Sequence, residues 1–186
     1  MENKSLKELK ADLLKLMDKE ALKRGKVILS SGKESNYYLD GRIITLTPEG
    51  AYLVASIILE MVNGKGINAI GGPTLGADPI TGAIAAVSHI NNIPLKTFIV
   101  RKAAKEYGMQ RQVEGPLLKK GEKVIIVDDV ATSGKSIIEA KTALDKLEVK
   151  IEGAIVIVDR NEGAKENLAR VGCELSSIFT IKDLGV

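Results

Sequence analysis

Two adjacent acidic residues, Asp128 and Asp129, follow a run of four branched apolar residues at positions 124–127. Such a run is typical of a strand that is buried on both faces of a parallel sheet. Side chains at the carboxyl end of such a strand lie where open α/β sheets bind their ligands. Repulsion and desolvation make two neighbouring carboxylates costly there unless both point into solvent. We therefore expect either a solvated pair or a pair that accepts hydrogen bonds from vicinal ribose hydroxyls.

Small and hydroxyl-bearing residues follow the acids and precede a predicted helix at 136–147. Backbone N–H groups at a helix N-terminus attract anions, so this segment is a candidate phosphate site. Carboxylates beside a phosphate site suggest one ligand that carries both hydroxyls and a phosphate, and a ribose phosphate fits that description. The residues that would surround its phosphate are Thr132, Ser133, Gly134, Lys135 and Ser136.

The residues Gly134, Lys135 and Ser136 also resemble the end of a nucleotide-hydrolase phosphate loop. That loop requires a glycine five positions before its second glycine, and Asp129 stands there, which excludes this class of enzyme. A dinucleotide-binding fingerprint is absent as well. The single histidine, His89, and the single cysteine offer no zinc-binding cluster.

A polar segment at 101–116 follows a predicted strand at 95–100 and begins with cationic residues. A loop of this length inside a compact domain is usually functional or disordered. We expect a mobile lid that brings Arg101, Lys102 and Lys105 to a phosphate group, with a merely solvated charged loop as the alternative. Arg160 follows another predicted strand, 151–158, and belongs to the same rim as the acids.

Two further segments each have two interpretations. The glycine-rich segment 71–77 either lets the backbone approach an anion closely or is only a tight connection between a strand and a helix. The segment 35–42 contains two of the four tyrosines. It is either a structural hairpin or a hood that presents an aromatic surface to a flat ligand.

Predicted strands and helices alternate from about residue 48 onward, which predicts a mostly parallel sheet with helices on both faces. Thr47 and Pro48 are typical of a helix start, and Asp78 and Pro79 repeat the signal. An amphipathic helix near the N-terminus is expected to cover the domain or a subunit interface and to extend to Gly25, which ends it. The whole chain is predicted to be a single structural domain, with an N-terminal helix and hood at 1–46 and an α/β core at 47–186.

The amino-acid composition limits the classes of partner that the protein is expected to bind. Of 186 residues, 45% are hydrophobic and 27% are charged, so a folded domain is expected. The net charge of +3 suits small anions as well as RNA, but 3% aromatic residues and no tryptophan are poor material for stacking nucleic-acid bases. One cysteine forms no internal disulfide, and no apolar run reaches transmembrane length. The N-terminal residues predict a charged amphipathic helix rather than a signal peptide. We expect a cytoplasmic protein without nucleic-acid or membrane partners.

Residues 124–136 resemble the phosphoribosyl-diphosphate signature of the type I phosphoribosyltransferases. Within that group the chain is similar to the orotate phosphoribosyltransferases, and the similarity extends over nearly its whole length. Residues 31–38 are similar to the hood motif of that family, and residues 71–79 to its pyrophosphate loop. Residues 101–105 are similar to the start of its catalytic loop, and residues 159–162 to the stretch whose arginine holds the orotate carboxylate.

The resemblance implies an α/β type I phosphoribosyltransferase fold and Mg²⁺-dependent transfer of a phosphoribosyl group from phosphoribosyl diphosphate to N1 of orotate. It implies a homodimer with shared active sites. It implies Mg²⁺ held mainly by the substrate near Asp128 and Asp129 rather than directly by protein ligands. The implied catalytic residues are Arg101, Lys102 and Lys105. The implied phosphoribosyl-diphosphate site contains those three cations with Asp128, Asp129, Val130, Ala131, Thr132, Ser133, Gly134, Lys135 and Ser136. The implied orotate site contains Thr132, Arg160, Tyr38 and Leu39.

The chain departs from the family at three positions. Relatives often carry a lysine where this chain has Ser30 or Leu75, and a histidine where it has Tyr107. Two other functions are weighed against the orotate enzyme. A purine-base phosphoribosyltransferase would have no carboxylate for Arg160 to pair with. A non-catalytic regulator with the same fold, including one that binds RNA, would be expected to lose the loop cations, which are present here.

Overall fold

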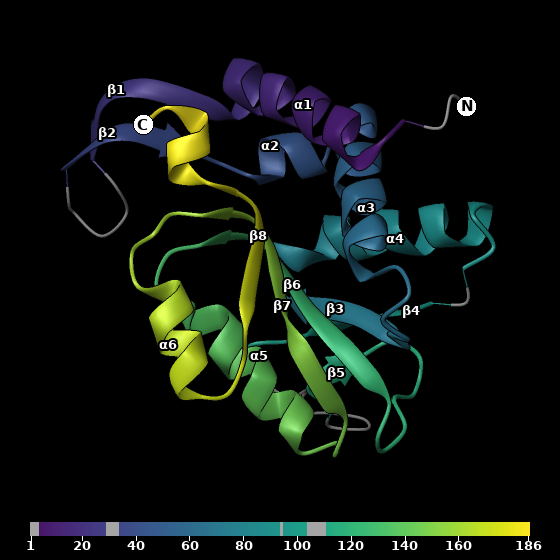
Figure 1. The fold of residues 1–186 in the computed structure, drawn as a ribbon. Coiled ribbons are helices and arrows are strands. Elements are labelled where there is room, and N and C mark those ends of the chain that lie inside the picture. Colours follow the sequence, from purple (N-terminus) through teal and green to yellow (C-terminus); the bar gives the residue numbers. More distant parts are fainter. Residues whose placement is uncertain (1–3, 29–33, 94, 104–110) are drawn as a thin grey trace.

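A computed structural model describes residues 4–28, 34–93, 95–103 and 111–186 (Figure 1). Its centre is a six-stranded sheet in the order β5-β4-β3-β6-β7-β8, in which only β5 runs antiparallel to its neighbour. The predicted mostly parallel α/β fold is therefore confirmed. The strands are β3 (Ala69–Pro73), β4 (Lys96–Val100), β5 (Val113–Glu114), β6 (Lys123–Ala131), β7 (Lys150–Asp159) and β8 (Leu175–Thr180).

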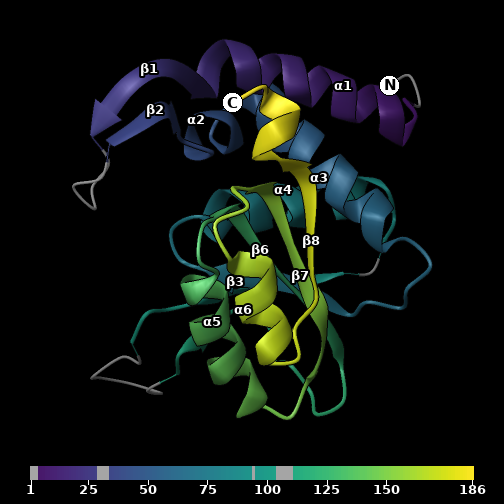
Figure 2. The same cartoon turned by 60° about the vertical axis from the view of Figure 1, so that its left-hand side comes forward.

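Helices cover both faces of this sheet, α3 and α4 on one side and α5 and α6 on the other (Figures 1 and 2). Thr47 caps α3 by accepting a hydrogen bond from the backbone N–H of Gly50, which confirms the predicted start of that helix. No helix within the described ranges is long and apolar enough to cross a membrane. The four helices are α3 (Pro48–Val62), α4 (Ala77–Ile90), α5 (Lys135–Asp145) and α6 (Ala164–Arg170).

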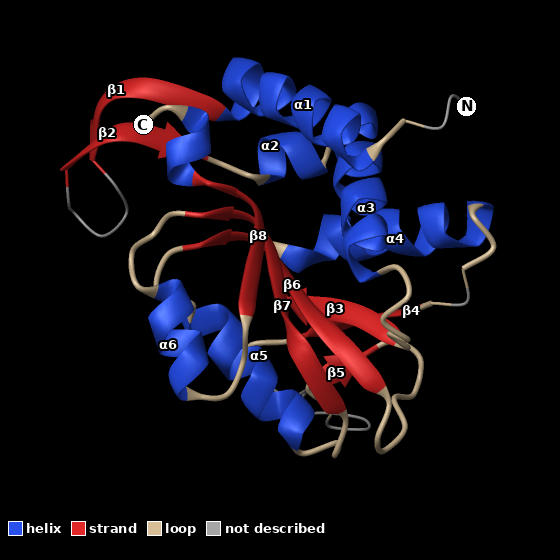
Figure 3. Ribbon diagram, viewed as in Figure 1, coloured by secondary structure: helices blue, strands red, loops and turns tan. Residues whose placement is uncertain are grey.

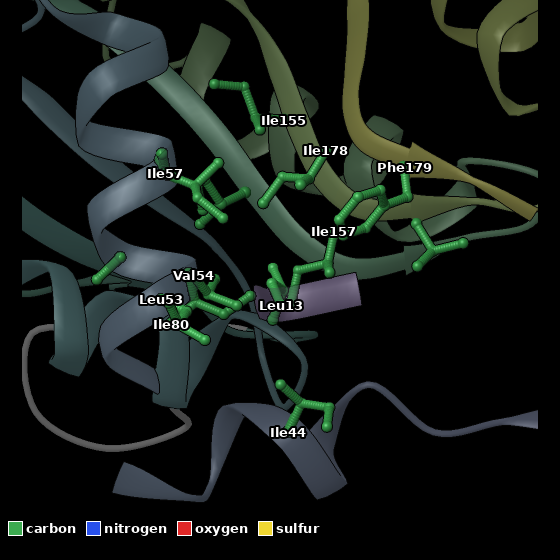
Figure 4. Packing of buried hydrophobic residues seen from close by; sticks show 14 of the residues in the cluster. Leu13, Ile44, Leu53, Val54, Ile57, Ile80, Ile155, Ile157, Ile178 and Phe179 are labelled. Carbon is green, nitrogen blue, oxygen red and sulfur yellow. The ribbon is translucent and has the colours of Figure 1, made fainter. Parts of the chain in front are cut away.

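The apolar run of β6 shows why the sheet needs both helical layers. Val124 and Ile126 pack into the cluster on the α5 and α6 side, whereas Ile125 and Val127 pack into the cluster on the α3 and α4 side. This alternation follows from the two-residue period of a strand. Figure 4 shows the cluster on the α3 and α4 side, where Ile155 and Ile157 of β7 face Ile57 of α3. The strand that carries the acids is thus fixed from both sides.

The N-terminal segment forms a layer across the carboxyl ends of the strands. Figures 2 and 3 show its hairpin, β1 and β2, above the loops that follow β6 and β7. Leu9 and Leu13 of α1 are buried in the same core as α3, so the prediction that this helix covers the domain is confirmed. The elements are α1 (Leu6–Leu16), a π-helical turn (Met17–Ala21), β1 (Leu22–Ile28), β2 (Glu34–Leu39) and α2 (Arg42–Thr45).

The end of the chain returns to this hood. After β8, a 3₁₀ turn at Ile181–Leu184 places the Leu184 carbonyl oxygen 2.9 Å from Nη2 of Arg24, which donates a hydrogen bond to it. Because the N-terminal layer shares its core with the sheet, the boundary between 46 and 47 stays a prediction about chain organisation.

Three predicted boundaries are wrong. The first helix does not extend to Gly25, because the chain turns at Met17–Ala21 and Gly25 lies inside β1 with φ +126°. Asp78 does not cap α4, since it is already in its first turn and its carboxylate accepts a hydrogen bond from the Thr74 hydroxyl at 2.6 Å. The strand before the acids does not stop at Val127 but continues to Ala131, because pairing with β7 persists that far.

Candidate active site

The acidic pair lies within the last residues of β6 rather than beyond them. Asp128 is only 6% exposed, so it does not point into solvent. Its Oδ2 accepts a hydrogen bond from the Ser136 hydroxyl at 2.8 Å, and its Oδ1 accepts one from the backbone N–H of Asp129 at 3.0 Å. Oδ1 of Asp129 accepts one from the backbone N–H of Val130 at 2.8 Å. The pair is held by its own strand and by the first turn of α5.

Burial makes negative charge costly here. Loss of hydration raises the pKa of Asp128 from its ordinary 3.8 to about 7, and the neighbouring Asp129 adds to the rise. Burial also raises the pKa of Asp129, against the opposing effects of its backbone hydrogen bond and of Arg42. Hydroxyl donors or a cation brought by a ligand would relieve this cost, which suits the pair to a hydroxyl-bearing, metal-bound substrate.

Two glycines make room for these carboxylates. A Cβ added at Gly76 would collide with Oδ1 of both Asp128 and Asp129, and one added at Gly41 would lie 2.9 Å from Cβ of Asp129. Gly71 and Gly72, by contrast, are part of β3, where Gly72 is packed against the carbonyl oxygen of Val127. The segment is thus tightly packed, against β6 at Gly72 and against the acids at Gly76, and its approach to a bound anion stays a prediction.

A cleft of about 560 Å³ opens between the hood and the sheet at this point. It brings together five residues predicted from the sequence: Tyr38, Leu39, Lys102, Asp129 and Val130. It also contains residues of the two segments predicted as a hood and as a glycine-rich loop, namely Asp40, Gly41, Arg42, Thr74, Leu75 and Gly76, none of which was predicted individually as a site residue. Arg42 is fixed by Asp40, whose Oδ1 and Oδ2 accept hydrogen bonds from Nε and Nη2 at 3.0 Å each.

The predicted lid begins at the edge of this cleft. The Arg101 backbone N–H donates to the Gln112 carbonyl oxygen at 2.9 Å, so the two ends of the segment are paired. The Arg101 side chain lies outside the cleft lining, with Nη1 3.8 Å from Oε1 of Glu114. Lys105 and Tyr107 lie outside the described residues, as does Ser30.

The predicted phosphate loop is exposed. Thr132 and Ser133 are accessible between β6 and α5, and Gly134 adopts φ +75° at the helix start. No side chain of the described residues caps that N-terminus, so its N–H groups can reach an anion. Asn167 of α6 fixes the loop by donating to the Ser133 carbonyl oxygen at 3.0 Å. The exposed Lys135 has Nζ 3.9 Å from a carboxylate oxygen of Glu139. The Ser136 hydroxyl is directed to Asp128 instead of into the loop.

Arg160 follows β7, next to the acids, and its backbone N–H donates to the Ala131 carbonyl oxygen at 3.0 Å. Its guanidinium lies 5.1 Å from the ring centroid of Tyr37, and its Nε donates a hydrogen bond to the Tyr37 hydroxyl at 3.0 Å. Nη2 lies 2.8 Å from a carboxylate oxygen of Glu162. Sequence reasoning missed Tyr37 and Glu162 as partners of Arg160, although Tyr37 belongs to the predicted aromatic hood.

The donor set fits a magnesium ion only in part. No group of three or more His, Cys, Asp or Glu side chains within the described ranges could hold a metal. Mg²⁺ is commonly bound by one or two carboxylates together with substrate phosphates and water. Asp128 and Asp129 match that arrangement.

Comparisons with known proteins agree with this geometry. The family described as "Phosphoribosyl transferase domain" matches residues 45–184. An orotate phosphoribosyltransferase from Rhodopirellula baltica is 43% identical over 182 residues, covering 95% of this chain and 94% of that protein. The chain belongs to the orotate phosphoribosyltransferase family. The orotate phosphoribosyltransferase of Mycobacterium tuberculosis, in a crystal structure with Fe(III) dicitrate, has a TM-score of 0.84 and 35% identity over 96% of this chain and 99% of that one.

A second crystal structure of the Mycobacterium tuberculosis enzyme contains 5-phospho-α-D-ribosyl 1-diphosphate. It has a TM-score of 0.80 and 31% identity over 96% of this chain and 99% of that one. Of the three positions where a departure from this family is predicted, Leu75 lies among the described residues; it lines the cleft and is 65% exposed.

Proposed function

We propose that this protein is an orotate phosphoribosyltransferase of pyrimidine nucleotide synthesis. It transfers the phosphoribosyl group of phosphoribosyl diphosphate to N1 of orotate and yields orotidine 5′-monophosphate and pyrophosphate. The observation that carries the proposal is the juxtaposition of an acidic pair at the end of β6 with an arginine at the end of the adjacent β7. The first suits ribose hydroxyls, and the second suits the carboxylate of an acidic base.

The reaction asks the protein mainly to position two substrates and to stabilise a departing anion. N1 of orotate attacks C1′ of the ribose while the bond from C1′ to pyrophosphate breaks, through a sugar with cationic character. Asp128 and Asp129 would accept hydrogen bonds from the ribose hydroxyls, and the residues Val130 to Ser136 would surround the 5′-phosphate. Binding both partners in line lowers the barrier chiefly through orientation and electrostatics.

Arg101, Lys102 and Lys105 would neutralise the pyrophosphate as it leaves, with Lys105 donating a proton to it. Lys102 already lines the cleft beside Asp129, which supports this assignment for the start of the lid. Arg160 and Thr132 would hold orotate, with Tyr38 and Leu39 of the hood against its ring. Tyr38 and Leu39 also line the cleft.

Mg²⁺ is the proposed cofactor, held mainly by the substrate beside Asp128 and Asp129. It would supply neutralisation of the negative charge on the diphosphate. A nearby cation would favour the ionised form of Asp128, whose pKa is raised by burial. Cytoplasmic location is proposed with it, as expected for a biosynthetic enzyme with a single cysteine.

We also propose a homodimer in which each lid serves the neighbouring site. An apolar hollow lined by Ile43, Leu46, Leu75 and Pro79 adjoins the cleft and shares Arg42 and Leu75 with it. Leu46 is 73% exposed, and a second copy would cover it. Sedimentation velocity tests this: the wild type should sediment as two chains and Leu46→Glu as one. Leu117→Glu, at a leucine that is 68% exposed elsewhere, is the control.

A direct assay tests the activity. Purified protein, Mg²⁺ and phosphoribosyl diphosphate are mixed with orotate, and the ultraviolet absorbance of orotate is followed. Orotate consumption with release of pyrophosphate is expected, and none is expected with adenine, guanine or uracil. Turnover of one of those bases without orotate turnover would refute the proposal. The purine-base and regulatory alternatives are not favoured, given the family and the retained Arg101 and Lys102.

A further inference from the structure

The Arg160 guanidinium forms an ion pair with a carboxylate of the protein itself. Its Nη2 lies 2.8 Å from Oε1 of Glu162, and its Nε donates to the Tyr37 hydroxyl at 3.0 Å. Among the described residues, none forms a hydrogen bond with Nη1. Nη1 is therefore without an acceptor among the described residues, while Glu162 occupies Nη2.

The chain fixes Glu162 in this place through a tight turn. Asp159, which is 6% exposed, accepts a hydrogen bond from the Asn161 backbone N–H at 2.9 Å. Asn161 adopts φ +55° and Gly163 φ +96°, and this reversal directs the side chain at 162 back to Arg160 before α6 begins. Arg160 and Glu162 are two positions apart, so the contact lies within this turn.

The two partners differ in how tightly they are held. The Arg160 side chain is 15% exposed and rests on the Tyr37 ring, whereas the Glu162 side chain is 46% exposed. A half-exposed ion pair contributes little, about 0.2–1 kcal/mol, because water solvates the charges almost as well. Glu162 can therefore release Arg160 and remain hydrated, while Arg160 keeps its position.

We propose that Glu162 is an internal counter-ion that occupies Arg160 until the carboxylate of an acidic base displaces it. This inference rests on the proposed function. The incoming carboxylate contacts Nη1 first and then replaces Glu162 at Nη2. It thereby accepts hydrogen bonds from both Nη atoms, and one carboxylate balances the charge of Arg160 before and after the exchange. A neutral base has no group to make the exchange, so the Arg160–Glu162 pair stays closed against it.

The test is equilibrium binding of orotate and of orotidine 5′-monophosphate, measured by calorimetry. Glu162→Gln keeps the shape of the side chain but removes its charge. We expect orotate and its nucleotide to bind about two- to fivefold more tightly to this variant, the range set by a partly exposed ion pair. Glu166→Gln, an exposed glutamate on α6, is the matched control and should bind as the wild type does.

Unchanged or weaker binding by Glu162→Gln would overturn the inference. Weaker binding would mean that Glu162 orients Arg160 for the substrate. Failure of the proposed function is distinguishable, because it would appear as absence of orotate binding and turnover in the wild type itself. Uracil provides the last readout: its binding should be the same in Glu162→Gln and in the wild type, and a gain as large as that for orotate would also overturn the inference.

Discussion

The acids at the end of β6 and the arginine at the end of β7 lie on adjacent strands, yet they are built in opposite ways. Asp128 is almost fully buried, and burial raises its pKa to about 7. Arg160 is paired with a glutamate whose side chain is 46% exposed. The first region holds negative charge in a place that disfavours it, whereas the second holds two opposite charges at the edge of solvent.

This difference indicates that the two regions are held in place for a substrate in different ways. The acidic pair is shaped by packing, since Gly41 and Gly76 leave no space beside it and Ser136 fixes one oxygen. The arginine is shaped by exchangeable contacts with side chains. We therefore expect the acidic region to respond to changes of volume and pH, and the arginine region to respond to changes of hydrogen bonding and charge.

The largest expected effect comes from filling the space beside the acids. Gly76→Ala adds a methyl group that collides with oxygens of both Asp128 and Asp129. We expect at least about a 100-fold fall in kcat/KM for phosphoribosyl diphosphate, because displacement of a positioned group by about 1 Å has effects of that size. Steady-state kinetics measures this. Gly82→Ala in α4, where nothing lies within 4 Å, is the control, and equal activity of both variants would contradict the packing argument.

Removal of the arginine comes next. Arg160→Ala should weaken orotate binding by about 2 kcal/mol, or roughly 30-fold, because the substrate carboxylate loses its charged partner. Calorimetric titration with orotate measures the change, and binding of phosphoribosyl diphosphate should remain nearly the same. Arg170→Ala at the end of α6 is the matched control. An unaltered dissociation constant for orotate would show that another group holds the carboxylate.

The pH dependence of stability distinguishes the two regions directly. Because the pKa of Asp128 is raised in the folded state, the unfolded chain ionises first as the pH rises from about 4 to about 7. The folded state binds more protons in this window, so the free energy of unfolding falls with rising pH. Asp128→Asn should remove about 2 kcal/mol of that fall between pH 5 and pH 8.

Urea unfolding at a series of pH values measures this slope. Some slope should remain in Asp128→Asn, because the pKa of Asp129 is raised as well. Asp145→Asn, at an aspartate of α5 whose side chain is 53% exposed, is the control and should keep the slope of the wild type. A slope that survives unchanged in Asp128→Asn would remove this carboxylate from the explanation.

The smallest effect is expected from a single hydroxyl. Tyr37→Phe keeps the ring beneath Arg160 but removes the oxygen that accepts from Nε. Orotate should bind about three- to fivefold more weakly, the size of one net hydrogen bond. Fluorescence or calorimetric titration measures it, with Tyr52→Phe on α3 as the control. Binding as tight as in the wild type would mean that the ring alone positions the arginine.

The sequence predicts the sheet, and it predicts that the acids, Lys102 and Arg160 follow strands, because these features depend on local pattern. Apolar runs mark buried strands, and chemistry follows at their carboxyl ends. The predicted end of β6 at Val127 is too early, because aspartate is uncommon in strands. Pairing of Asp128 with Val156 and of Val130 with Val158 in β7 overrides that preference.

The partners of Arg160 and the close packing beside the acids could not be predicted, because they depend on contacts between residues far apart in the sequence. Tyr37 and Arg160 are 123 positions apart, and Gly76 meets Asp128 only after two crossovers of the chain. Spacing along the sequence contains no record of such contacts. The domain boundary at 46 and 47 and the assigned residue roles remain predictions for experiment.

The contact between Arg24 and the Leu184 carbonyl oxygen has a consequence for biosynthesis. These residues are 160 positions apart, so the hairpin is synthesised well before the segment that provides this partner. Contacts of such high sequence separation form late and slow the folding of a chain. We expect the sheet to assemble before the hood is fastened over it, so that a nascent chain would have its strands in place while its orotate pocket is still open.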